Sequence, residues 1–486
     1  MTTAPPSKIE NAAPLPKKGE ELELTVDSLA YGGQGVARHN GFVVFIEKGA
    51  LPGSRVRALI TKRRKGFAEA RVLEVLTQSQ QAVEAPCAHF GVCGGCATQD
   101  LDYQEQLRQK QAQVADLFAR LGGFRDLEVR PIIGCRDTFN YRNKMEFTCS
   151  NRGWVVDKAD LDNAPEWVLG LHVPGRYDKV LDIEECHLQH PIGNGILKLV
   201  RTRAKELGLE PWDIKAHTGF LRHLVIRVTQ AQTGSPQVMV NLVTSREEPR
   251  RLKPLSDDLV AAFPEITSVV NNINTTKASV AYGQWEVVLH GKPTITEHLL
   301  GRSFDISANS FFQTNSAQAE ALYGQIVAAC GLSGGEVVYD LYCGTGTIGI
   351  VLAEQAQEVA GFEMAQSAVE DASRNALAND VFNIRFFAAD LNTKYFSIHA
   401  KRLKQQVLSP DVVVLDPPRA GVNPRMIPEI GQLGAGRVVY VSCNPATQVR
   451  DVRLLIQQGY RLKWAQPVDM FPHTPHIENI CLLEKD

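Results

Sequence analysis

The chain has 486 residues, of which 44% are hydrophobic and 22% are charged. A chain of this length is expected to form roughly two to four domains, and its composition is typical of a soluble globular protein. No apolar run approaches the ~20 residues that cross a bilayer, so a membrane protein is not expected. The opening residues lack the apolar core of a secretory signal, which favours a cytoplasmic protein whose residues 1–18 form a disordered tail.

The net charge of −2 gives no sign of a nucleic-acid partner, but the charges are unevenly distributed. Residues 25–72 contain nine Lys or Arg residues and three Asp or Glu residues. Arg63, Arg64 and Lys65 belong to a run of four consecutive cations. Such a run is either a solvated face or a patch that contacts phosphates, and the charge pattern alone leaves both interpretations open.

Residues 19–78 form several short strand patterns with glycine-rich turns between them. They predict a small OB-like β-barrel of a type that often binds oligonucleotides. A cysteine-rich loop follows at residues 79–98, and residues 99–125 predict a linking helix that ends near Gly122 and Gly123. Residues 126–300 are rich in strand patterns and predict a β-rich central domain.

Residues 301–486 alternate helical stretches with short, continuous apolar strands. That alternation predicts a parallel sheet with helices on both faces, as in a Rossmann-like α/β domain. The expected fold is therefore a multidomain α/β protein with an N-terminal barrel and a β-rich middle.

The segment from Val337 to Gly349 is an apolar strand followed by a glycine-rich turn and the start of a helix. Glycines let the backbone approach a ligand closely, and a helix N-terminus offers free N–H groups. A dinucleotide-binding domain uses a similar loop, so the segment alone does not identify the cofactor. Glu363, at the end of the next strand, is placed to meet ribose hydroxyls, and Asp390 is placed to meet an adenine amino group. Either acid could instead cap a helix or lie in a solvated loop.

Asp416 begins an Asp-Pro-Pro-Arg segment directly after a short apolar strand. This segment matches a motif of nucleic-acid methyltransferases. It therefore argues against a nicotinamide cofactor in the glycine-rich turn.

Cys443 lies in the segment Ser-Cys-Asn-Pro-Ala-Thr, after another strand of the same predicted sheet. Enzymes with α/β folds place their chemistry at that edge, so a catalytic thiol is expected rather than a small buried residue. A thiolate that adds to carbon 6 of uracil makes carbon 5 carbanion-like, and carbon 5 then attacks a methyl sulfonium. A base must afterwards remove the proton from carbon 5. Glu478 is preferred for this step, and its rivals are Asp469, His473 and His476.

The cofactor loop, the Asp-Pro-Pro-Arg and Ser-Cys-Asn-Pro-x-Thr segments and the terminal His-x-Glu-Asn together resemble the bacterial RNA uridine-C5 methyltransferase family. Its 23S ribosomal RNA branch is the nearest match. The resemblance implies S-adenosylmethionine as the methyl donor, Cys443 as the nucleophile and Glu478 as the base. The implied cofactor contacts are Gln313, Tyr342, Thr347, Glu363, Asp390 and Asp416.

The segment around Gln313 matches the family's Phe-x-Gln-x-Asn pattern. The resemblance implies that Phe312 and Asn315 help to hold the flipped base, although Phe311 and Phe312 are equally compatible with a place in the core. The N-terminal barrel resembles a TRAM domain, a small RNA-binding module. The basic run is therefore expected to contact RNA.

Cys87, Cys93 and Cys96 place three thiols within ten residues, which suits zinc or an iron–sulfur cluster better than disulfides in a cytoplasmic chain. A fourth ligand is needed, and the candidates are Cys135, Cys149 and Cys186. The resemblance selects Cys186 and implies a [4Fe–4S] cluster. The spacing differs from that of radical S-adenosylmethionine enzymes, so a cluster that is structural or orients RNA is expected.

The expected substrate is a uridine of 23S ribosomal RNA, and a uridine of the tRNA T-loop is the alternative. A second hypothesis, from a different functional class, is a non-catalytic RNA-binding assembly factor. The intact Cys443, Asp416 and Glu478 argue against it. An iron–sulfur redox enzyme would need a second redox centre. No obligate protein partner is expected, and residues 151–169 match no part of the family pattern.

Overall fold

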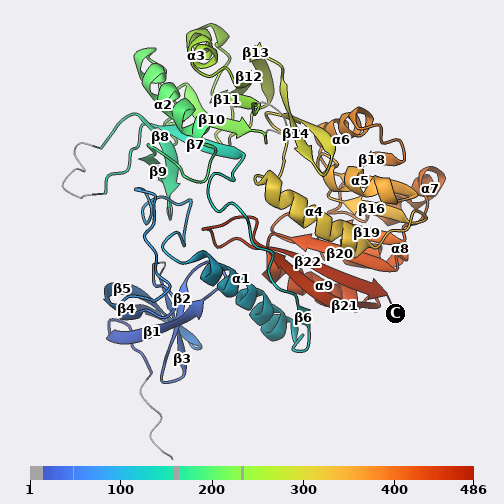
Figure 1. The fold of residues 1–486 in the computed structure, drawn as a ribbon, viewed down its shortest axis with the longest axis horizontal. Helices are drawn as coiled ribbons and strands as arrows, with labels where there is room; N and C mark the ends of the chain where they lie inside the picture. The colour runs from blue at the N-terminus through green and yellow to red at the C-terminus, as the bar shows by residue number, and fades with distance from the viewer. Residues whose placement is uncertain (1–14, 48, 157–163, 231–234, 486) are drawn as a thin grey trace, which may run out of the picture. The chain divides into compact units, whose positions relative to one another are not determined.

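A computed structural model describes residues 15–47, 49–156, 164–230 and 235–485 (Figure 1). Most of the predicted tail at residues 1–18, and part of the unmatched segment at residues 151–169, lie outside the described residues. The chain divides into two compact units. The first comprises Met1–Ala85 and Ala97–Gln109, and the second comprises Pro86–Cys96 and Lys110–Asp486. No described helix is long and apolar enough to span a membrane.

Five strands of the first unit form a closed barrel in the order β1-β2-β3-β5-β4. They are β1 (Glu21–Leu29), β2 (Gly35–His39), β3 (Phe42–Ile46), β4 (Arg55–Arg63) and β5 (Phe67–Thr77). Side chains alternate between the two faces of a strand, so the inward residues Val26, Val44 and Ile60 form the barrel core. The predicted small barrel is thus present.

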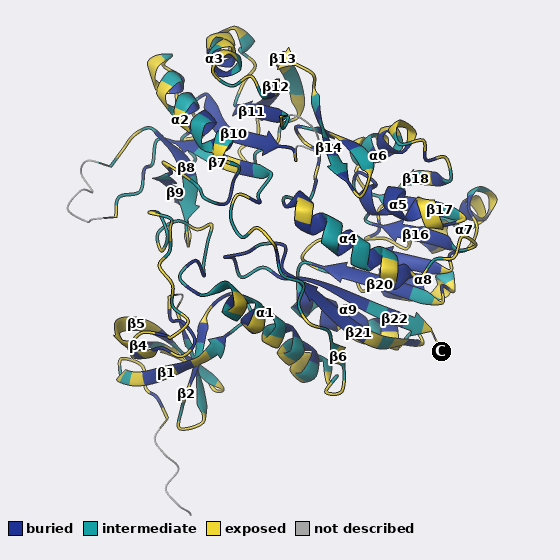
Figure 2. Cartoon of the chain, in the orientation of Figure 1, coloured by how far each residue is buried: buried dark blue, intermediate teal, exposed yellow. Residues whose placement is uncertain are grey.

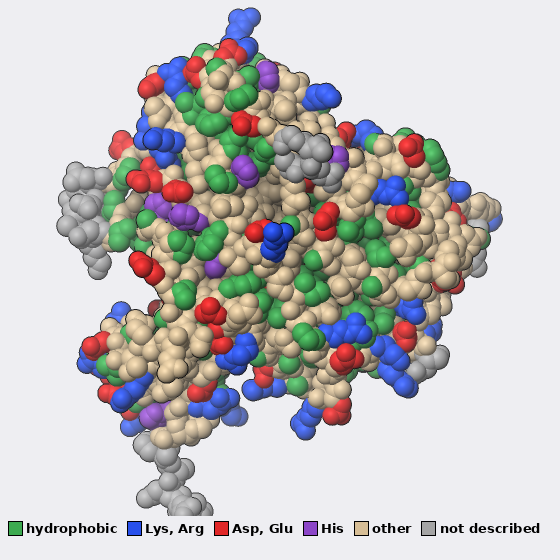
Figure 3. Space-filling view, viewed as in Figure 1, with side chains coloured by type: hydrophobic (Ala, Val, Ile, Leu, Met, Phe, Trp, Pro, Cys, Tyr) green, Lys and Arg blue, Asp and Glu red, His purple; other side chains and the backbone are tan. Residues whose placement is uncertain are grey.

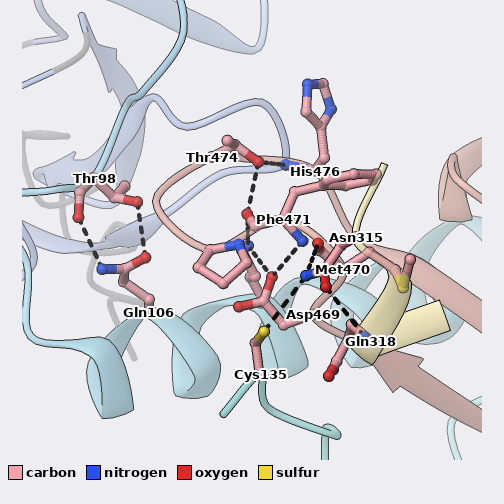
Figure 4. A network of polar contacts seen from close by, with 12 residues as sticks. Thr98, Gln106, Cys135, Asn315, Gln318, Asp469, Met470, Phe471, Thr474 and His476 are labelled. Atoms are coloured by element: carbon pink, nitrogen blue, oxygen red, sulfur yellow. Dashed lines mark hydrogen bonds and ion pairs between the residues drawn. The ribbon is translucent and has the colours of Figure 1, made fainter. Parts of the chain in front are cut away.

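Helix α1 (Tyr103–Leu117) is the predicted linking helix. Asp102 begins it, because its Oδ1 accepts the backbone N–H of Gln104 at 2.9 Å. Gln106 holds the preceding turn by donating to the carbonyl of Thr98 at 2.9 Å (Figure 4). A π-helical turn at Phe118–Gly122 continues α1, and Gly123 ends it with a left-handed φ of 78°.

The middle of the chain forms a seven-stranded sheet in the order β13-β12-β11-β10-β7-β8-β9. Its strands are β7 (Lys144–Ser150), β8 (Val168–Val173), β9 (Arg176–Asp182), β10 (Leu221–Val228), β11 (Val238–Thr244), β12 (Ile266–Ile273) and β13 (Trp285–Gly291). Helices α2 (Pro191–Glu206) and α3 (Pro249–Ala262) pack against one face through an apolar core that includes Phe147, Leu224 and Val240 (Figure 1).

The C-terminal part forms an eight-stranded sheet in the order β18-β17-β16-β19-β20-β22-β21-β6. Its strands are β6 (Glu128–Val129), β16 (Val337–Leu341), β17 (Glu358–Glu363), β18 (Ile384–Ala388), β19 (Val412–Leu415), β20 (Arg437–Ser442), β21 (Tyr460–Val468) and β22 (Glu478–Lys485). Its helices are α4 (Ser316–Cys330), α5 (Thr347–Leu352), α6 (Gln366–Ala378), α7 (Tyr395–Gln406), α8 (Met426–Leu433) and α9 (Pro445–Ile456), and a short 3₁₀ turn, η3 (Ala353–Gln355), follows α5. A separate hairpin of β14 (Thr294–Leu299) and β15 (Arg302–Ser307) precedes this sheet.

The strands β16 to β20 of this sheet are parallel, and all of them except the edge strand β18 are largely buried, as continuous apolar runs predict (Figure 2). β22 pairs antiparallel with both β20 and β21. The predicted multidomain α/β fold, with a barrel, a β-rich middle and a Rossmann-like C-terminal domain, is confirmed.

One edge of the C-terminal sheet comes from early in the chain. β6 pairs in parallel with β21 at Trp464 and Ala465. The strand pattern predicts that residues 126–300 belong to the central domain. A strand of two residues is too short to show the alternation of apolar and polar residues that would assign it to a sheet.

Candidate active site

The parallel strands of the C-terminal sheet end at a common edge where the strand order reverses. From β16 the chain moves outward through β17 to β18, and then returns to the other side of β16 for β19 and β20. Open α/β sheets bind ligands at this switch point, outside the carboxyl ends of the strands. The residues that follow these ends include Tyr342, Asp390, Asp416 and Cys443, and Glu363 is the last residue of β17.

The glycine-rich turn after β16 has a backbone that few other residues could adopt. Tyr342, Gly344 and Gly346 all have left-handed φ angles, of 67°, 53° and 79°. A Cβ on Gly346 would lie 2.7 Å from the ring of Phe386, so only glycine fits there. The hydroxyl of Tyr342 is buried and has no hydrogen-bond partner among the described residues. The turn therefore offers both a close backbone approach and an unused polar atom to a ligand.

The other predicted cofactor residues lie around this turn. Glu363 accepts the backbone N–H of Gly344 at 3.2 Å, and its second oxygen accepts that of Ala365 at 2.9 Å. Asp390 is exposed, and its Oδ1 accepts the N–H of Asn392 at 2.9 Å. Both acids thus have local backbone partners, as the capping alternative expected. Each carboxylate also has further acceptor capacity for hydroxyl or amino groups.

Thr347 begins α5, and its hydroxyl lies 3.2 Å from that of Tyr323. Asp416 follows β19, and burial raises the pKa of its carboxyl to about 7. Burial and the charge of Asp416 likewise raise the pKa of Asp340 to about 7. Two buried acids at this edge favour a cationic ligand, because a cation lowers the pKa of both.

Sequence analysis missed Asp340. It is the fourth of the five residues of β16, where its Oδ2 accepts the N–H of Gly349 at 2.9 Å and its Oδ1 has no partner among the described residues. An acid inside an otherwise continuous apolar strand was the signal that could have found it.

Cys443 lies between the end of β20 and the start of α9. Asn444 caps α9, with its Oδ1 accepting the N–H of Ala446 at 3.2 Å. The side chains of Asn444 and Thr447 both donate to the carbonyl of Arg419, at 3.1 and 3.2 Å. The Ser-Cys-Asn-Pro-Ala-Thr turn is therefore fixed against the Asp-Pro-Pro-Arg segment, which brings these two motifs together.

The register of β20 with β22 brings Glu478 to the same edge. Ser442 pairs with Asn479, so Cys443, the residue after β20, and Glu478, the first residue of β22, both adjoin this last pair of the two strands. Gln448 secures this pairing by donating to the carbonyl of Asn479 at 3.0 Å and accepting from its side chain at 2.7 Å. Cys443 and Glu478 are thus held in adjacent backbone positions.

The two groups also affect each other electrostatically. Burial, followed by the charges of Glu478 and Asp416, raises the pKa of Cys443 to about 12, and Arg419 opposes the shift. Burial and the charge of Asp416 raise the pKa of Glu478 well above its usual range. A thiol and a carboxyl with perturbed pKa values at the carboxyl edge of the parallel strands are typical of a catalytic site.

The rivals of Glu478 have other partners. Asp469 forms a buried ion pair with Lys110, with 2.6 Å between Oδ1 and Nζ. The ring of His473 stacks on Phe139, with 4.3 Å between centroids. His476 packs edge-on against Phe471, with 6.1 Å between centroids. Of the four candidates, Glu478 is the one that the strand register places beside Cys443.

The predicted base-holding residues Phe312 and Asn315 are both buried. Phe312 is 5% exposed and packs in the core against Phe304, whereas its neighbour Phe311 is 69% exposed. Asn315 is fully buried, caps α4 by accepting the N–H of Gln318 at 3.1 Å, and donates to the carbonyl of Met470 at 3.1 Å. Neither Phe312 nor Asn315 presents a free face for a base, because both side chains are used in packing and capping.

The segment that carries Phe311 and Gln313 is held by the central sheet. Asn143 donates to the carbonyl of Gln313 at 2.8 Å and to the hydroxyl of Ser316 at 2.7 Å. The buried Arg227 of β10 donates to the carbonyl of Ser310. Sequence analysis missed both Asn143 and Arg227, since nothing in their local pattern indicates a partner so distant in the chain.

The cysteine loop of the second unit lies against the segment that contains Cys186. A Cβ on Gly94 would lie 2.8 Å from the carbonyl of His172, so the loop approaches β8 as closely as a glycine allows. The imidazole of His89 accepts the N–H of Glu184 at 3.1 Å. Burial raises the pKa of Cys93 to about 11, and the charges of Cys186 and Cys87 add to the shift. These three thiols are therefore near neighbours.

Within the described residues, no three His, Cys, Asp or Glu side chains are close enough to hold a single metal ion. A [4Fe–4S] cluster does not need that closeness, because each of its four thiolates binds a different iron. Three mutually interacting thiols from two segments are compatible with such a cluster. Cys96 belongs to the same loop and is partly buried, like the other three.

The predicted basic run forms the tip of the β4–β5 hairpin of the barrel. Arg63, Arg64 and Lys65 are exposed, and none of the ion pairs among the described residues includes them. Four other barrel cations, Arg38, Arg55, Arg57 and Lys62, pair with acids. On the face drawn in Figure 3, cationic and acidic side chains are interspersed. The run is therefore a local cationic feature on a surface of mixed charge.

Comparison with known proteins agrees with this geometry. Residues 292–486 match the family described as tRNA (Uracil-5-)-methyltransferase, and residues 16–73 match the TRAM domain. A protein of Chlorobaculum tepidum described as an uncharacterized RNA methyltransferase is 41% identical over 476 residues, covering 96% of this chain and 97% of the relative. A protein of Porphyromonas gingivalis with the same description is 40% identical over 476 residues, covering 95% and 100%.

The fold also matches a solved structure over almost its whole length. The Pyrococcus abyssi tRNA (uracil-54, C5)-methyltransferase, in complex with S-adenosyl-L-homocysteine, superposes with a TM-score of 0.71 and 29% identity. The match covers 95% of this chain and 100% of that chain. The chain belongs to the S-adenosylmethionine-dependent RNA (uracil-5-)-methyltransferases.

Proposed function

We propose that this enzyme methylates carbon 5 of a uridine through a covalent bond between the Cys443 sulfur and carbon 6 of the base. The observation that carries the proposal is the pairing of Ser442 with Asn479, which places Cys443 and Glu478 side by side at the carboxyl edge of the sheet. A nucleophile and a base in adjacent positions are what addition followed by elimination requires.

The first role of the chain is to supply a thiolate. With a pKa of about 12, the Cys443 thiol is protonated in the free enzyme at neutral pH. Bound S-adenosylmethionine supplies the electrophilic methyl group on a cationic sulfonium, and a cation at this edge lowers the pKa of the thiol. Arg419 acts in the same direction. We therefore expect the thiolate to form in the loaded site.

Addition of the Cys443 sulfur to carbon 6 moves the ring electrons toward carbon 5. Carbon 5 then takes the methyl group as the bond from that group to the sulfonium breaks, and the electron pair of the broken bond stays with the donor. The Cys443 sulfur is now a neutral thioether, so one negative charge beside Glu478 has disappeared. Loss of that charge lowers the pKa of Glu478 and favours its carboxylate. Glu478 then removes the carbon-5 proton, the carbon–sulfur bond breaks, and Cys443 leaves as the thiolate.

Six residues are proposed to bind the cofactor: Gln313, Tyr342, Thr347, Glu363, Asp390 and Asp416. The exposed ring of Phe311, two residues before Gln313, offers an aromatic face that could stack on RNA bases. We therefore assign to Phe311 the base-contacting role that sequence analysis gave to Phe312. Arg63, Arg64 and Lys65 of the TRAM barrel are proposed to contact RNA phosphates.

Cys87, Cys93, Cys96 and Cys186 are proposed to hold a [4Fe–4S] cluster. The mutual effects among three of these thiols and the close approach of the Gly94 loop support this assignment. The methyl transfer described above needs no electron transfer. The cluster would therefore tie the cysteine loop to the central sheet.

We propose a uridine of 23S ribosomal RNA as the substrate. The second candidate is a tRNA uridine, favoured by the match with a tRNA (uracil-54, C5)-methyltransferase. Mass mapping of 5-methyluridine in ribosomal and transfer RNA, from cells with and without the gene, decides between them. Loss of one methyl group from 23S RNA supports the first candidate, and loss from tRNA alone supports the second.

A further inference from the structure

We propose that Lys110 and Asp469 form a positioning pair that holds the β21–β22 loop, residues 469–477, in the shape that places Glu478 beside Cys443. This inference rests on the proposed role of Glu478 as the base. Lys110 Nζ lies 2.6 Å from Asp469 Oδ1, and their side chains are only 5% and 0% exposed. A buried ion pair at the first residue of this loop takes no part in the proposed chemistry.

The pair closes the first turn of the loop. Asp469 Oδ1 also accepts the backbone N–H of Phe471 at 3.3 Å, and Lys110 Nζ also donates to the carbonyl of Phe471 at 3.1 Å. Both polar groups of the Phe471 backbone are therefore bound by the ion pair. The backbone N–H of Asp469 donates to the carbonyl of Ile133 at 2.9 Å, which fixes the start of the turn.

Neighbouring residues hold the rest of the loop (Figure 4). The side chain of Asn315 donates to the carbonyl of Met470 at 3.1 Å, and the hydroxyl of Tyr141 donates to that of Pro472 at 3.2 Å. Thr474 Oγ1 donates to the carbonyl of Phe471 at 2.8 Å and accepts the N–H of His476 at 3.3 Å. The loop is therefore anchored at successive residues from its start almost to Glu478. Unlike these hydrogen bonds, the Lys110–Asp469 contact joins two opposite charges.

An ion pair at this depth constrains geometry because each charge needs the other. Burial lowers the pKa of Lys110, and the charge of Asp469 opposes that shift. Removal of one partner leaves an unpaired buried charge, whereas removal of both avoids that cost. The ammonium also carries directional donors, and a neutral replacement of both partners does not restore them. Charge compensation and the direction of the ammonium hydrogen bonds are therefore two separate effects, and an experiment can distinguish them.

The test uses the full-length enzyme in a single turnover with a labelled methyl donor and substrate RNA. Lys110→Met is compared with Glu478→Gln and with a matched control, Arg437→Met. Arg437 pairs with Glu484 at 3.3 Å, at the far end of the strand that Glu478 begins. For Lys110→Met, we expect the methylated protein–RNA adduct to form at nearly the wild-type rate. Its product should be released about 100-fold more slowly, which is the loss typical of a catalytic group displaced by about 1 Å.

The double variant Lys110→Met/Asp469→Asn distinguishes positioning from stability, and it also serves if the single variant folds poorly. It should recover most of the thermal stability and still release product slowly. Recovery of fast release together with stability would reduce the pair to a structural role, and slow release by Arg437→Met would do the same. If the adduct accumulates in Glu478→Gln but not in Lys110→Met, the positioning role of the pair is overturned and the role of Glu478 as the base is retained. Full turnover by Glu478→Gln overturns the base assignment and, with it, this inference.

Discussion

Ser442 of β20 pairs with Asn479 of β22, and this one step of register brings Cys443 and Glu478 together from segments 35 residues apart. The pairing is antiparallel, so the end of one strand and the start of the other lie at the same edge of the sheet. A shift of one residue would turn every side chain of β22 to the opposite face. The register is therefore as important for the proposed site as the identity of its residues.

The division of work between the two residues is testable with single variants. Cys443→Ala should bind RNA and form neither adduct nor product, because it has no sulfur to add to carbon 6. Glu478→Gln should add, transfer the methyl group and then stall, because the carbon-5 proton has no acceptor. On a denaturing gel, methyl label should migrate with a protein–RNA species for Glu478→Gln only. An adduct formed by Cys443→Ala would move the nucleophile to another residue.

The raised pKa of Cys443 predicts how its reactivity depends on pH. In the free enzyme, alkylation of Cys443 should rise about tenfold per pH unit from pH 7 to 10 without a plateau, because the thiolate is the reactive form. Glu478→Gln should react faster at pH 9, since loss of a neighbouring negative charge lowers the pKa of the thiol. Peptide mass spectrometry measures the alkylation at this residue. A plateau below pH 8 would contradict the burial argument.

The two buried acids at the cofactor edge predict a pH-dependent stability. The folded pKa of Asp340, about 7, lies above its unfolded value of about 4, so its contribution to stability is present at low pH and is lost as pH rises through 7. The loss develops between about pH 4 and pH 7, so Asp340→Asn should raise the melting temperature of the cofactor-free enzyme at pH 8 and change it little at pH 4. Asp257→Asn, at an exposed position of α3, is the control and should have no such dependence. Equal effects at both pH values would show that Asp340 is ionised throughout.

The basic tip of the barrel predicts a change in salt dependence. Replacing Arg63, Arg64 and Lys65 with Ala should make the fall of log affinity for RNA with log salt concentration less steep. The magnitude of the slope should decrease by about 2 to 3, as loss of three phosphate contacts implies. The affinity for the methyl donor should not change. The matched control replaces Arg38, Arg55 and Arg57, which pair with acids. An equal loss of slope in the control would make the effect one of net charge rather than of the hairpin tip.

The cysteine loop predicts bound iron. Enzyme purified without oxygen should contain about four irons per chain and absorb broadly in the visible range. Cys93→Ser should lose this absorbance, and Cys149→Ser should retain it because Cys149 is buried within β7. Stoichiometric zinc without iron in the anaerobic preparation would refute the cluster assignment.

The fold class was predictable because its signals are local. The apolar runs of β16, β19 and β20 and the glycines of the cofactor turn are legible in a window of ten residues or so. Phe311 and Phe312 were not separable in this way, since neighbouring aromatic residues look alike until packing exposes one and buries the other. Lys110 and Asn143 were missed for a different reason. Their partners, Asp469 and Gln313, lie 359 and 170 residues away, and a single sequence carries no record of those contacts.

The pairing of β6 with β21 has a consequence for synthesis on the ribosome. Glu128 is made long before Trp464, the residue it pairs with, and at about 5–20 residues per second the interval is on the order of 20–70 seconds. The barrel has all of its strands before β6 is made, and the central sheet gains its last strand at Gly291, whereas the edge strand β6 has no partner until β21 is made. Residues 128–129 of the nascent chain must therefore stay unpaired for that time. The C-terminal sheet is complete only when the hairpin of β21 and β22 emerges.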